Sequence, residues 1–161
     1  MSDDLELAYF AGAVDADGWI TILRQVRGKS QGTTHHEVLG LAQVTPTVPY
    51  QLCARFGGIV HIRKRPGTSA KNWRTIYYWQ VLSIRATMAV TCLRPYLRVK
   101  AAQADILIEL RRSLDRPWQQ RRTVPIGVRA RGLDPAVQAE RAALYERVRL
   151  LNHNGEAPLV L

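Results

Sequence analysis

The chain has 161 residues, of which 47% are hydrophobic and 22% charged, with a net charge of +10 at neutral pH. These proportions suit a single globular domain and exclude a disordered or collagen-like protein. No apolar run approaches the roughly 20 residues that a membrane-spanning helix needs, and the acidic N-terminus is unlike a leader peptide, so we expect a soluble intracellular protein.

Turn-forming residues divide the first part of the chain into short elements. Asp3 or Asp4 can cap a first helix that continues to about Val14 and ends at Gly18. β-rich stretches and paired glycines then predict two strands, a short helix and two further strands. These five elements cover residues 19–26, 35–44, 48–56, 59–65 and 73–84.

The second part of the chain is predicted to be helical. Residues 86–114 have helical periodicity that is interrupted at Pro95, which predicts two helices joined by a bend. Residues 115–133 are basic and poorly periodic, and we interpret them as a linker before a last helix over 134–152. We therefore expect one domain whose core lies within 5–114, and the sequence contains no internal repeat.

The first predicted helix carries a face of small side chains. Ala8, Ala11, Gly12 and Asp15 are spaced at i, i+3, i+4 and i+7, which lets a second helix approach closely. Asp17 follows two residues later, and carboxylates crowded at such a helix end favour a divalent cation, for which Mg²⁺ is suited. An Asp-x-Asp pair alone is more often a solvated helix end, so the surrounding pattern has to support the metal site.

The distribution of charge supplies part of that pattern. Residues 1–23 hold five acids and no base, whereas residues 38–104 hold ten basic residues and no acid. A stretch of this kind contains no carboxylates to neutralise its positive charge, so we expect the folded domain to present a positive face that suits a polyanion. Arginine supplies 19 of the 23 basic residues, and its planar fork suits phosphate and guanine edges.

Two separated motifs carry a resemblance to a known family. Residues 7–18, Leu-Ala-Tyr-Phe-Ala-Gly-Ala-Val-Asp-Ala-Asp-Gly, closely resemble the signature of the LAGLIDADG homing endonucleases. Residues 93–100, Leu-Arg-Pro-Tyr-Leu-Arg-Val-Lys, followed by Gln103, are similar to the Pro-aromatic-Leu run of that family that ends in lysine. The resemblance implies an α+β fold of αββαββα order, with a four-stranded antiparallel DNA-binding saddle per subunit and additional C-terminal helices.

The resemblance also implies an activity, namely site-specific cleavage of double-stranded DNA by an enzyme encoded by a mobile intron or similar element. By it, Asp17 and the main-chain carbonyl of Ala16 bind the catalytic Mg²⁺ ion, and Lys100 stabilises the phosphate or helps to deprotonate water. Cutting two strands takes two copies of Asp17, so the resemblance implies a homodimer and a nearly palindromic site. The dimer interface would be formed by Ala8, Ala11, Gly12 and Asp15.

The saddle would contact DNA through alternate side chains of its strands and through basic side chains of the linker. For the fourth strand, alternation leaves two rows open: one contains Tyr77 and Trp79, which we take as expected contacts, and the other contains Tyr78 and Gln80. The full expected set is Thr21, Leu23, Gln25, Arg27, Glu37, Leu39, Leu41, Gln43, Arg63, Arg65, Tyr77, Trp79, Arg121 and Arg122.

A second hypothesis keeps the fold without cleavage, as an RNA maturase or a non-cutting DNA-binding protein. Family members often have polar, water-organising residues at the start of the second helix, and Pro46 and Tyr50 occupy those positions here. We expect Gln43 to reach a base or a water molecule instead. The presence of Asp17, Gly18 and Lys100 favours the enzyme.

Overall fold

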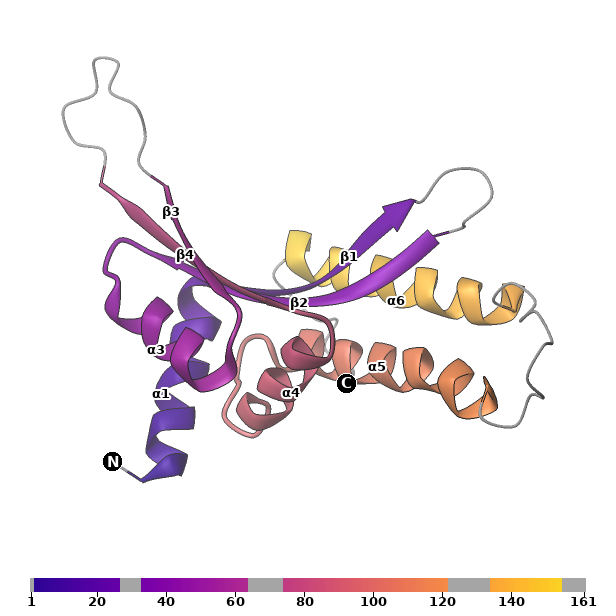
Figure 1. Cartoon of the computed structure of the whole chain (residues 1–161), viewed down its shortest axis with the longest axis horizontal. Coiled ribbons are helices and arrows are strands. Elements are labelled where there is room, and N and C mark those ends of the chain that lie inside the picture. The colour runs from indigo at the N-terminus through magenta and orange to yellow at the C-terminus, as the bar shows by residue number, and fades with distance from the viewer. Residues whose placement is uncertain (1, 27–32, 64–73, 122–133, 155–161) are drawn as a thin grey trace, which may run out of the picture.

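The structure is a computed structural model that describes residues 2–26, 33–63, 74–121 and 134–154, with the main chain only at 117–121 and 154. Within these ranges, helices cover one face of a four-stranded antiparallel sheet, as Figure 1 shows. No described helix is long and apolar enough to cross a membrane. The elements in chain order are α1 (Asp3–Asp17), β1 (Gly18–Val26), β2 (Thr33–Gln43), α3 (Thr47–Phe56), β3 (Ile59–Arg63), β4 (Ile76–Leu82), α4 (Ser83–Leu93), α5 (Ala101–Arg121) and α6 (Pro135–Asn154).

The first helix starts one residue earlier than the sequence pattern predicted. Ser2 is the N-cap, because its hydroxyl accepts a hydrogen bond from the Leu5 N–H at 3.4 Å, and the acidic residues of the first turn complement the positive end of the helix dipole. The helix ends at Gly18, as expected. A Cβ there would lie 2.7 Å from the Val14 carbonyl oxygen and 2.9 Å from that of Gly40, so glycine lets the end of α1 approach β2.

The sheet is made of two antiparallel hairpins that join through their second strands, in the order β1-β2-β4-β3. The outer ends of both hairpins rise away from the helices, so the face without helices is concave (Figure 1). Residues paired across strands point to the same side of a sheet. Ile20 pairs with Leu39, and Leu41 with Trp79, and all four are fully buried, so this row faces the helices.

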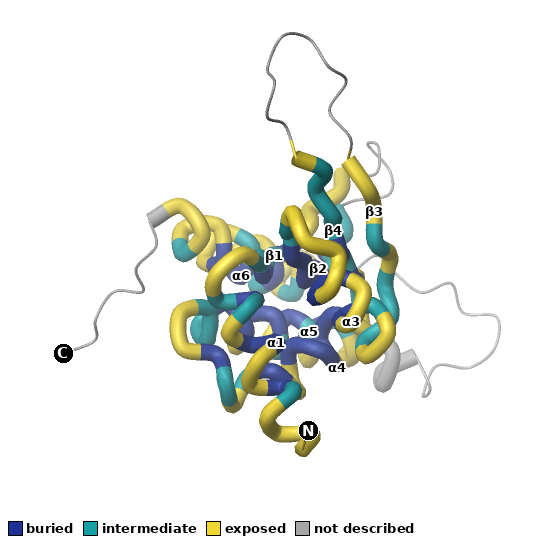
Figure 2. Tube along the Cα trace, turned by 90° about the vertical axis from the view of Figure 1, so that its left-hand side faces the viewer, coloured by how far each residue is buried: buried dark blue, intermediate teal, exposed yellow. Residues whose placement is uncertain are grey.

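One hydrophobic core lies between the sheet and the helices, and it appears in Figure 2 as the buried interior of the molecule. On α1 the buried positions Leu7, Phe10, Ala11 and Val14 repeat at i, i+3, i+4 and i+7, the stripe of a helix that covers a core. Each of the other helices adds residues to the same cluster or packs partly buried residues against it. The end of α1 is therefore held firmly against the sheet.

Two of the predicted boundaries that differ from the structure have a clear local cause. The fourth strand stops at Leu82, because Ser83 adopts a positive φ of 57° and begins α4. The predicted linker over 115–133 is wrong in its first part, since α5 continues to Arg121 through Pro117. Residues 122–133, including Arg122, lie outside the described part of the chain.

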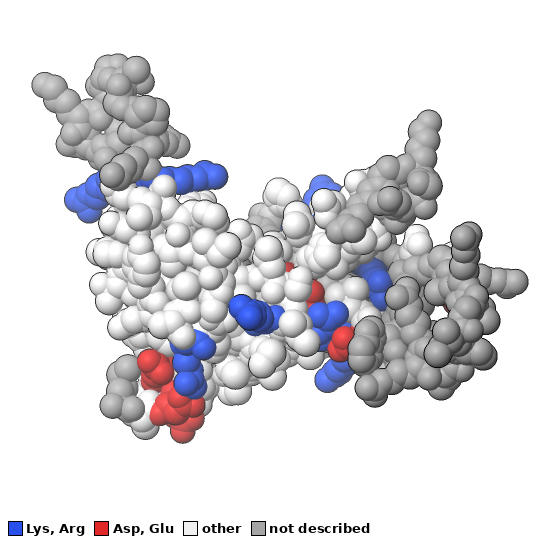
Figure 3. All heavy atoms as spheres, in the orientation of Figure 1, with Lys and Arg blue, Asp and Glu red and all other residues white. Residues whose placement is uncertain are grey.

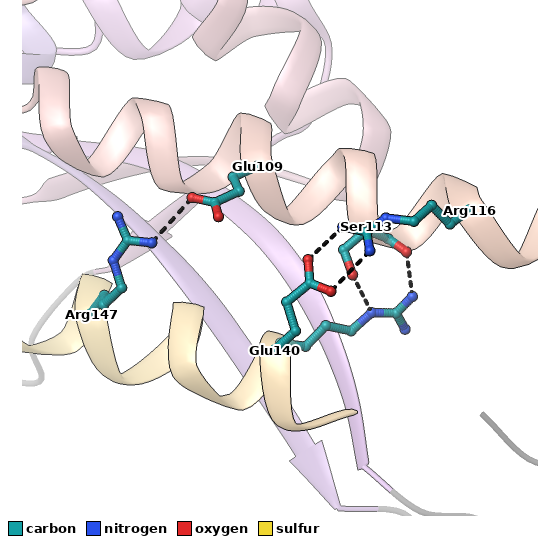
Figure 4. Close-up of polar contacts among 6 residues, drawn as sticks. Glu109, Ser113, Arg116, Glu140 and Arg147 are labelled. Atoms are coloured by element: carbon teal, nitrogen blue, oxygen red, sulfur yellow. Dashed lines mark hydrogen bonds and ion pairs between the residues drawn. The ribbon is translucent and has the colours of Figure 1, made fainter. Parts of the chain in front are cut away.

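The extension of α5 past Pro117 depends on a contact with α6. Proline has no N–H, so the Ser113 carbonyl lacks the donor that a helix would supply four residues later. Arg141 of α6 donates to that carbonyl oxygen from Nη2 at 2.6 Å and to the Ser113 hydroxyl from Nε at 3.1 Å. Ion pairs of Arg116 with Glu140 and of Arg147 with Glu109 flank this contact (Figure 4), so α6 is fastened along α5.

Alanine substitutions of the two glycines that follow α3 are predicted to differ in their effect on stability. Gly57 and Gly58 have positive φ angles of 75° and 93°, but a Cβ at Gly57 would meet only the Arg85 side chain, whereas one at Gly58 would overlap with the Gln80 carbonyl oxygen. We expect Gly57→Ala to lower the free energy of unfolding by about 1 kcal/mol. Gly58→Ala should lower it by about 2 kcal/mol more. Urea denaturation followed by circular dichroism measures both, and equal losses would contradict the close approach of residue 58 to β4.

Candidate active site and sheet surface

Asp17 is an exposed carboxylate at the C-terminal end of α1, where the chain turns into β1. Its Oδ2 accepts a hydrogen bond from the Gln43 side-chain amide at 2.9 Å, and Gln43 is the last residue of β2. Among the described residues no other hydrogen bond or ion pair to this carboxylate is present. Oδ1 is therefore free to bind a cation.

Lys100 lies beside this carboxylate, on the bend that leads into α5. Its ammonium donates to the main-chain carbonyl oxygen of Asp15, and no ion pair among the described residues joins it to Asp17. Burial lowers the pKa of the Lys100 ammonium, and the nearby carboxylates of Asp15 and Asp17 oppose that shift. The structure thus brings together Asp17 and Lys100, which the sequence places 83 residues apart.

The carboxylate of Asp15 is fully engaged within its own protomer. Its Oδ2 accepts hydrogen bonds from the main-chain N–H groups of Arg98 at 2.7 Å and Val99 at 3.1 Å, and its Oδ1 accepts one from Lys100 at 2.9 Å. Three consecutive N–H groups that converge on one anion form a nest. Asp15 therefore fastens α1 to the bend before α5, and its assignment to a dimer interface stays a prediction.

The small-residue face of α1 is only partly exposed. Ala8 and Gly12 are exposed, and a Cβ at Gly12 would have nothing within 4 Å. Ala11, however, has no exposed surface, because it packs into the core of its own protomer. Its assignment to the exposed interface is wrong, since Leu7, Phe10 and Val14 share its stripe and turn it inward.

The donor set at the end of α1 fits a hydrated Mg²⁺ ion. Asp17 offers an exposed carboxylate oxygen, and the adjacent Ala16 is exposed as well. The described residues contain no cluster of three or more His, Cys, Asp or Glu side chains that could enclose a metal by themselves. Mg²⁺ suits such an open site, because it keeps several water ligands and commonly binds one or two carboxylates together with phosphate oxygens.

The strands place one predicted row on the open face and another against the helices. Thr21, Leu23 and Gln25 lie on the open face, since Thr21 pairs with Val38 and Leu23 with His36, in the row opposite to Ile20. The side chains of Arg27 and Arg65 fall outside the described residues, as does that of Arg121. Arg63 is exposed on the open face, diagonally across from Tyr78.

The predicted phase of β2 is wrong. Glu37, Leu39 and Leu41 have at most 1% of their surface exposed and face the helices. Two leucines in one row supply apolar surface that the core buries, whereas the alternate row contains the smaller Gly40 and Ala42. The Glu37 carboxylate is held by the Thr87 hydroxyl and the Arg111 guanidinium, each at 3.1 Å.

The pairing of β4 with β2 also determines which β4 side chains face the helices. Trp79 is fully buried and donates its indole N–H to the Gly57 carbonyl oxygen at 2.8 Å, and Tyr77 lies in the same helix-facing row. The expected DNA contacts at Tyr77 and Trp79 are therefore wrong, because both side chains face the helices. Tyr78 and Gln80 belong to the row on the open face. Gln43 shares the inward row with Leu41, and this phase could have located it beside Asp17 from the sequence.

The open face carries an aromatic cluster of Trp19 and Tyr78, of which the sequence indicated Tyr78 only as one of two alternatives. The ring of Trp19 lies over Gly40, where a Cβ would overlap with the indole. Its centroid is 5.3 Å from that of Tyr78, and the Arg63 guanidinium lies 5.1 Å above the Tyr78 ring. The concave side thus presents two aromatic rings with a cation beside one of them.

The sheet and the N-terminal end of α1 differ in their content of acidic side chains. Glu37 is the single carboxylate among the residues of the four described strands, and it faces the helices, so the described open face contains no acid. In Figure 3, acidic side chains gather at the N-terminal end of α1, far from the raised end of the β3–β4 hairpin, where basic side chains lie. The acidic residues of this end are Asp3, Asp4 and Glu6.

Several solved structures with this architecture are homing endonucleases. Two structures of the homing endonuclease I-CvuI, one with its own target and Ca and one with the I-CreI target and Mg, match with TM-scores of 0.67 and 0.68 and identities of 25% and 24%. Both matches cover 99% of this chain and 88% of I-CvuI. The meganuclease I-SmaMI, bound to uncleavable DNA, matches with a TM-score of 0.65 and 14% identity over 94% of this chain and 45% of its own.

No protein-family model and no curated protein sequence gives a significant match to the chain. The fold, the helix that ends in Asp-Ala-Asp-Gly and the Pro-Tyr-Leu run that ends in Lys100 nevertheless occur together. In these features the chain resembles the LAGLIDADG homing endonucleases, whose fold it has. In this chain the second helix, α3, begins with exposed Pro46 and Tyr50, and Gln43 supplies the amide that contacts Asp17.

Substitutions of Asp15 and Asp17 are predicted to lower stability by different amounts. Asp15→Ala removes the acceptor of three N–H groups and should lower the free energy of unfolding by about 2 kcal/mol. Asp17→Ala removes one exposed contact and should lower it by no more than about 0.5 kcal/mol. Urea denaturation of both variants at neutral pH tests this difference. A loss for Asp17→Ala as large as that for Asp15→Ala would contradict the free carboxylate of Asp17.

Proposed function

We propose that this chain is a homodimeric, Mg²⁺-dependent endonuclease that cuts both strands of a long, nearly palindromic duplex DNA site. The observation that carries the proposal is the exposed Asp17 carboxylate, which keeps one oxygen free beside Lys100 at the end of α1. This pair lies where α1 turns into β1, and the described residues of the open sheet face include no acid. The resemblance to homing endonucleases in fold and motifs supports DNA cleavage as its use.

The open face is the surface proposed to bind DNA. Antiparallel strands fit the major groove and offer alternate side chains to base edges. Of the contacts expected from the sequence, Thr21, Leu23, Gln25 and Arg63 lie on this face, and the related I-CvuI structures are complexes with DNA. Arg27, Arg65, Arg121 and Arg122 stay predictions of phosphate or base contacts. Tyr78 and Gln80 join the proposed set through their position in the open row.

Each residue of the candidate active site has a proposed task. Asp17, with the main-chain carbonyl of Ala16, holds the divalent cation, and Gln43 fixes the orientation of the Asp17 carboxylate. The cation, when bound, supplies charge that activates water and stabilises the oxygens of the phosphodiester. Lys100 places an ammonium where negative charge grows on the phosphate. The related I-CvuI structures were obtained with Mg or Ca, which supports a divalent cation.

Dimerisation is proposed because one chain offers one Asp17, whereas two strands require two such sites. The exposed ridge of α1, with Ala8 and Gly12, allows the close approach of a second α1 across a two-fold axis. Leu5 and Tyr9, which are 62% and 51% exposed, would add apolar area to this contact.

A maturase-like RNA-binding protein, or a non-cutting DNA-binding protein of the same fold, is the second candidate. It is favoured by the start of α3, where Pro46 and Tyr50 stand at positions that often hold water-organising polar residues in the family. The ring of Tyr50 instead lies 6.3 Å from that of Tyr77. Binding of duplex DNA or structured RNA with no cleavage of any randomised duplex in Mg²⁺ would support this candidate.

The cleavage site is tested by selecting cut members of a randomised duplex library with Mg²⁺ and measuring rates on the selected duplex. Asp17→Asn should lower the single-turnover rate by at least about 100-fold, because it weakens the proposed cation ligand. DNA affinity in Ca²⁺ should stay within about threefold, because phosphate and base contacts elsewhere dominate binding. The matched control Glu146→Gln removes an exposed carboxylate of α6 and should leave both quantities unchanged. Cleavage by Asp17→Asn at the wild-type rate would overturn the assignment.

The dimer is tested by filling the exposed ridge of α1. Gly12→Leu should raise the dimer dissociation constant at least about tenfold, since a bulky side chain keeps the two helices apart. Ala54→Leu, at an exposed position of α3, is the control and should leave association unchanged. Sedimentation equilibrium measures both variants. A dimer of normal affinity for Gly12→Leu would contradict the proposed ridge.

A further inference from the structure

We propose that Asp15 is a positioning residue for the reaction, which acts through Lys100 and keeps its ammonium beside, but not paired with, Asp17. This inference rests on the proposed function. Asp15 contacts Lys100 at two points. The Asp15 carboxylate accepts a hydrogen bond from the Lys100 main-chain N–H, and the Asp15 main-chain carbonyl accepts one from the Lys100 ammonium. One residue of α1 thus fixes both the main chain and the side-chain tip of Lys100.

The C-terminal end of α1 is stabilised by a positive charge that comes from outside the helix. A helix C-terminus carries partial negative charge on carbonyl groups that have no helical donor. The last turn of α1 contains no basic residue. Lys100 supplies that positive charge from the bend before α5, through its bond to the Asp15 carbonyl. The ammonium is therefore held by the helix end and not by the carboxylate of Asp17.

The N-terminal end of α5 is likewise stabilised by a negative charge from outside the helix. Its first turn contains no acidic residue, although a helix N-terminus favours negative charge. Lys100 is the last residue before this helix, since its carbonyl accepts the first helical hydrogen bond from the Ala104 N–H at 3.0 Å. The Asp15 carboxylate, bound to the three N–H groups of residues 98–100, supplies the missing charge. Asp15 and Lys100 thus complement the charges of each other's helix ends.

This reciprocal arrangement has a consequence for catalysis. Asp17 is two residues beyond Asp15 on the same helix end, so the position of Lys100 relative to Asp15 also sets its position relative to Asp17. An ammonium that was free to move could form an ion pair with Asp17 and compete with the cation for the carboxylate. By holding the ammonium on a carbonyl oxygen, Asp15 leaves Asp17 available for the cation and keeps Lys100 close to the phosphate.

The experiment is a double-mutant cycle between Asp15→Asn and Lys100→Met, with single-turnover cleavage of the selected duplex in Mg²⁺ as the readout. Asp15→Asn keeps the main-chain carbonyl that binds the ammonium, so any effect on Lys100 comes through the position of the bend. Rates are measured at a temperature at which urea denaturation shows every variant folded. Asp105→Asn is the matched control, because it removes an ion pair with Arg94 at the same α4–α5 turn without touching residues 98–100.

We expect Asp15→Asn to slow cleavage by about 10- to 100-fold in the wild-type background, since small displacements of a reacting group have effects of this size. In the Lys100→Met background it should slow cleavage less than about twofold, because a positioning effect is lost with the residue that is positioned. DNA affinity in Ca²⁺ and the rate of Asp105→Asn should both stay within about threefold of wild type.

An equal slowing by Asp15→Asn in both backgrounds would overturn the inference while leaving the endonuclease intact, and so would an unchanged rate in the wild-type background. A wild-type protein that cleaves no member of the library would instead overturn the proposed function, and the positioning role with it. The two failures are therefore distinguished by the wild-type protein alone.

Discussion

The contact between the Asp15 carboxylate and the three N–H groups before α5 fixes the geometry on which the rest of the site depends. It joins two segments that are more than 80 residues apart in sequence and brings Lys100 to the end of α1. Gly18 makes a second close approach possible, between α1 and β2, and this places Gln43 against Asp17. A helix end, a strand end and a bend thus converge on one exposed carboxylate.

Element order was predictable from the sequence because turn residues mark the boundaries: Gly18 ends α1, Gly57 ends α3, and an irregular segment separates α4 from α5. The facing of β2 was not predicted, because alternation defines two rows and the choice between them depends on which row the helices bury. The leucines of β2 were the available signal. The extension of α5 past Pro117 could not be inferred locally, since it depends on Arg141 of a different helix.

The candidate site was predicted only in part, because sequence motifs identify residues but not the segments that pack against them. Asp17 and Lys100 follow from two motifs that the chain keeps together, and the structure brings both residues to one place. Ala11 was misplaced because helical spacing shows which residues share a face but not what covers that face, and Ala11 packs into the core of its own protomer. The contact of Asp15 with the bend before α5 joins residues far apart in the sequence, so helical spacing could not show it either.

Glu37 shows how the register of the sheet and the charge of its open face depend on one another. A buried carboxylate is unfavourable unless it is paired, and here the guanidinium of Arg111 and the hydroxyl of Thr87 supply its partners from α5 and α4. A shift of β2 by one residue would turn Glu37 to the open face, leave Arg111 without its buried partner and expose Leu39 and Leu41. It would also place negative charge where a polyanion is proposed to bind. The same inward-facing row therefore supports the core and keeps the described open face free of acid.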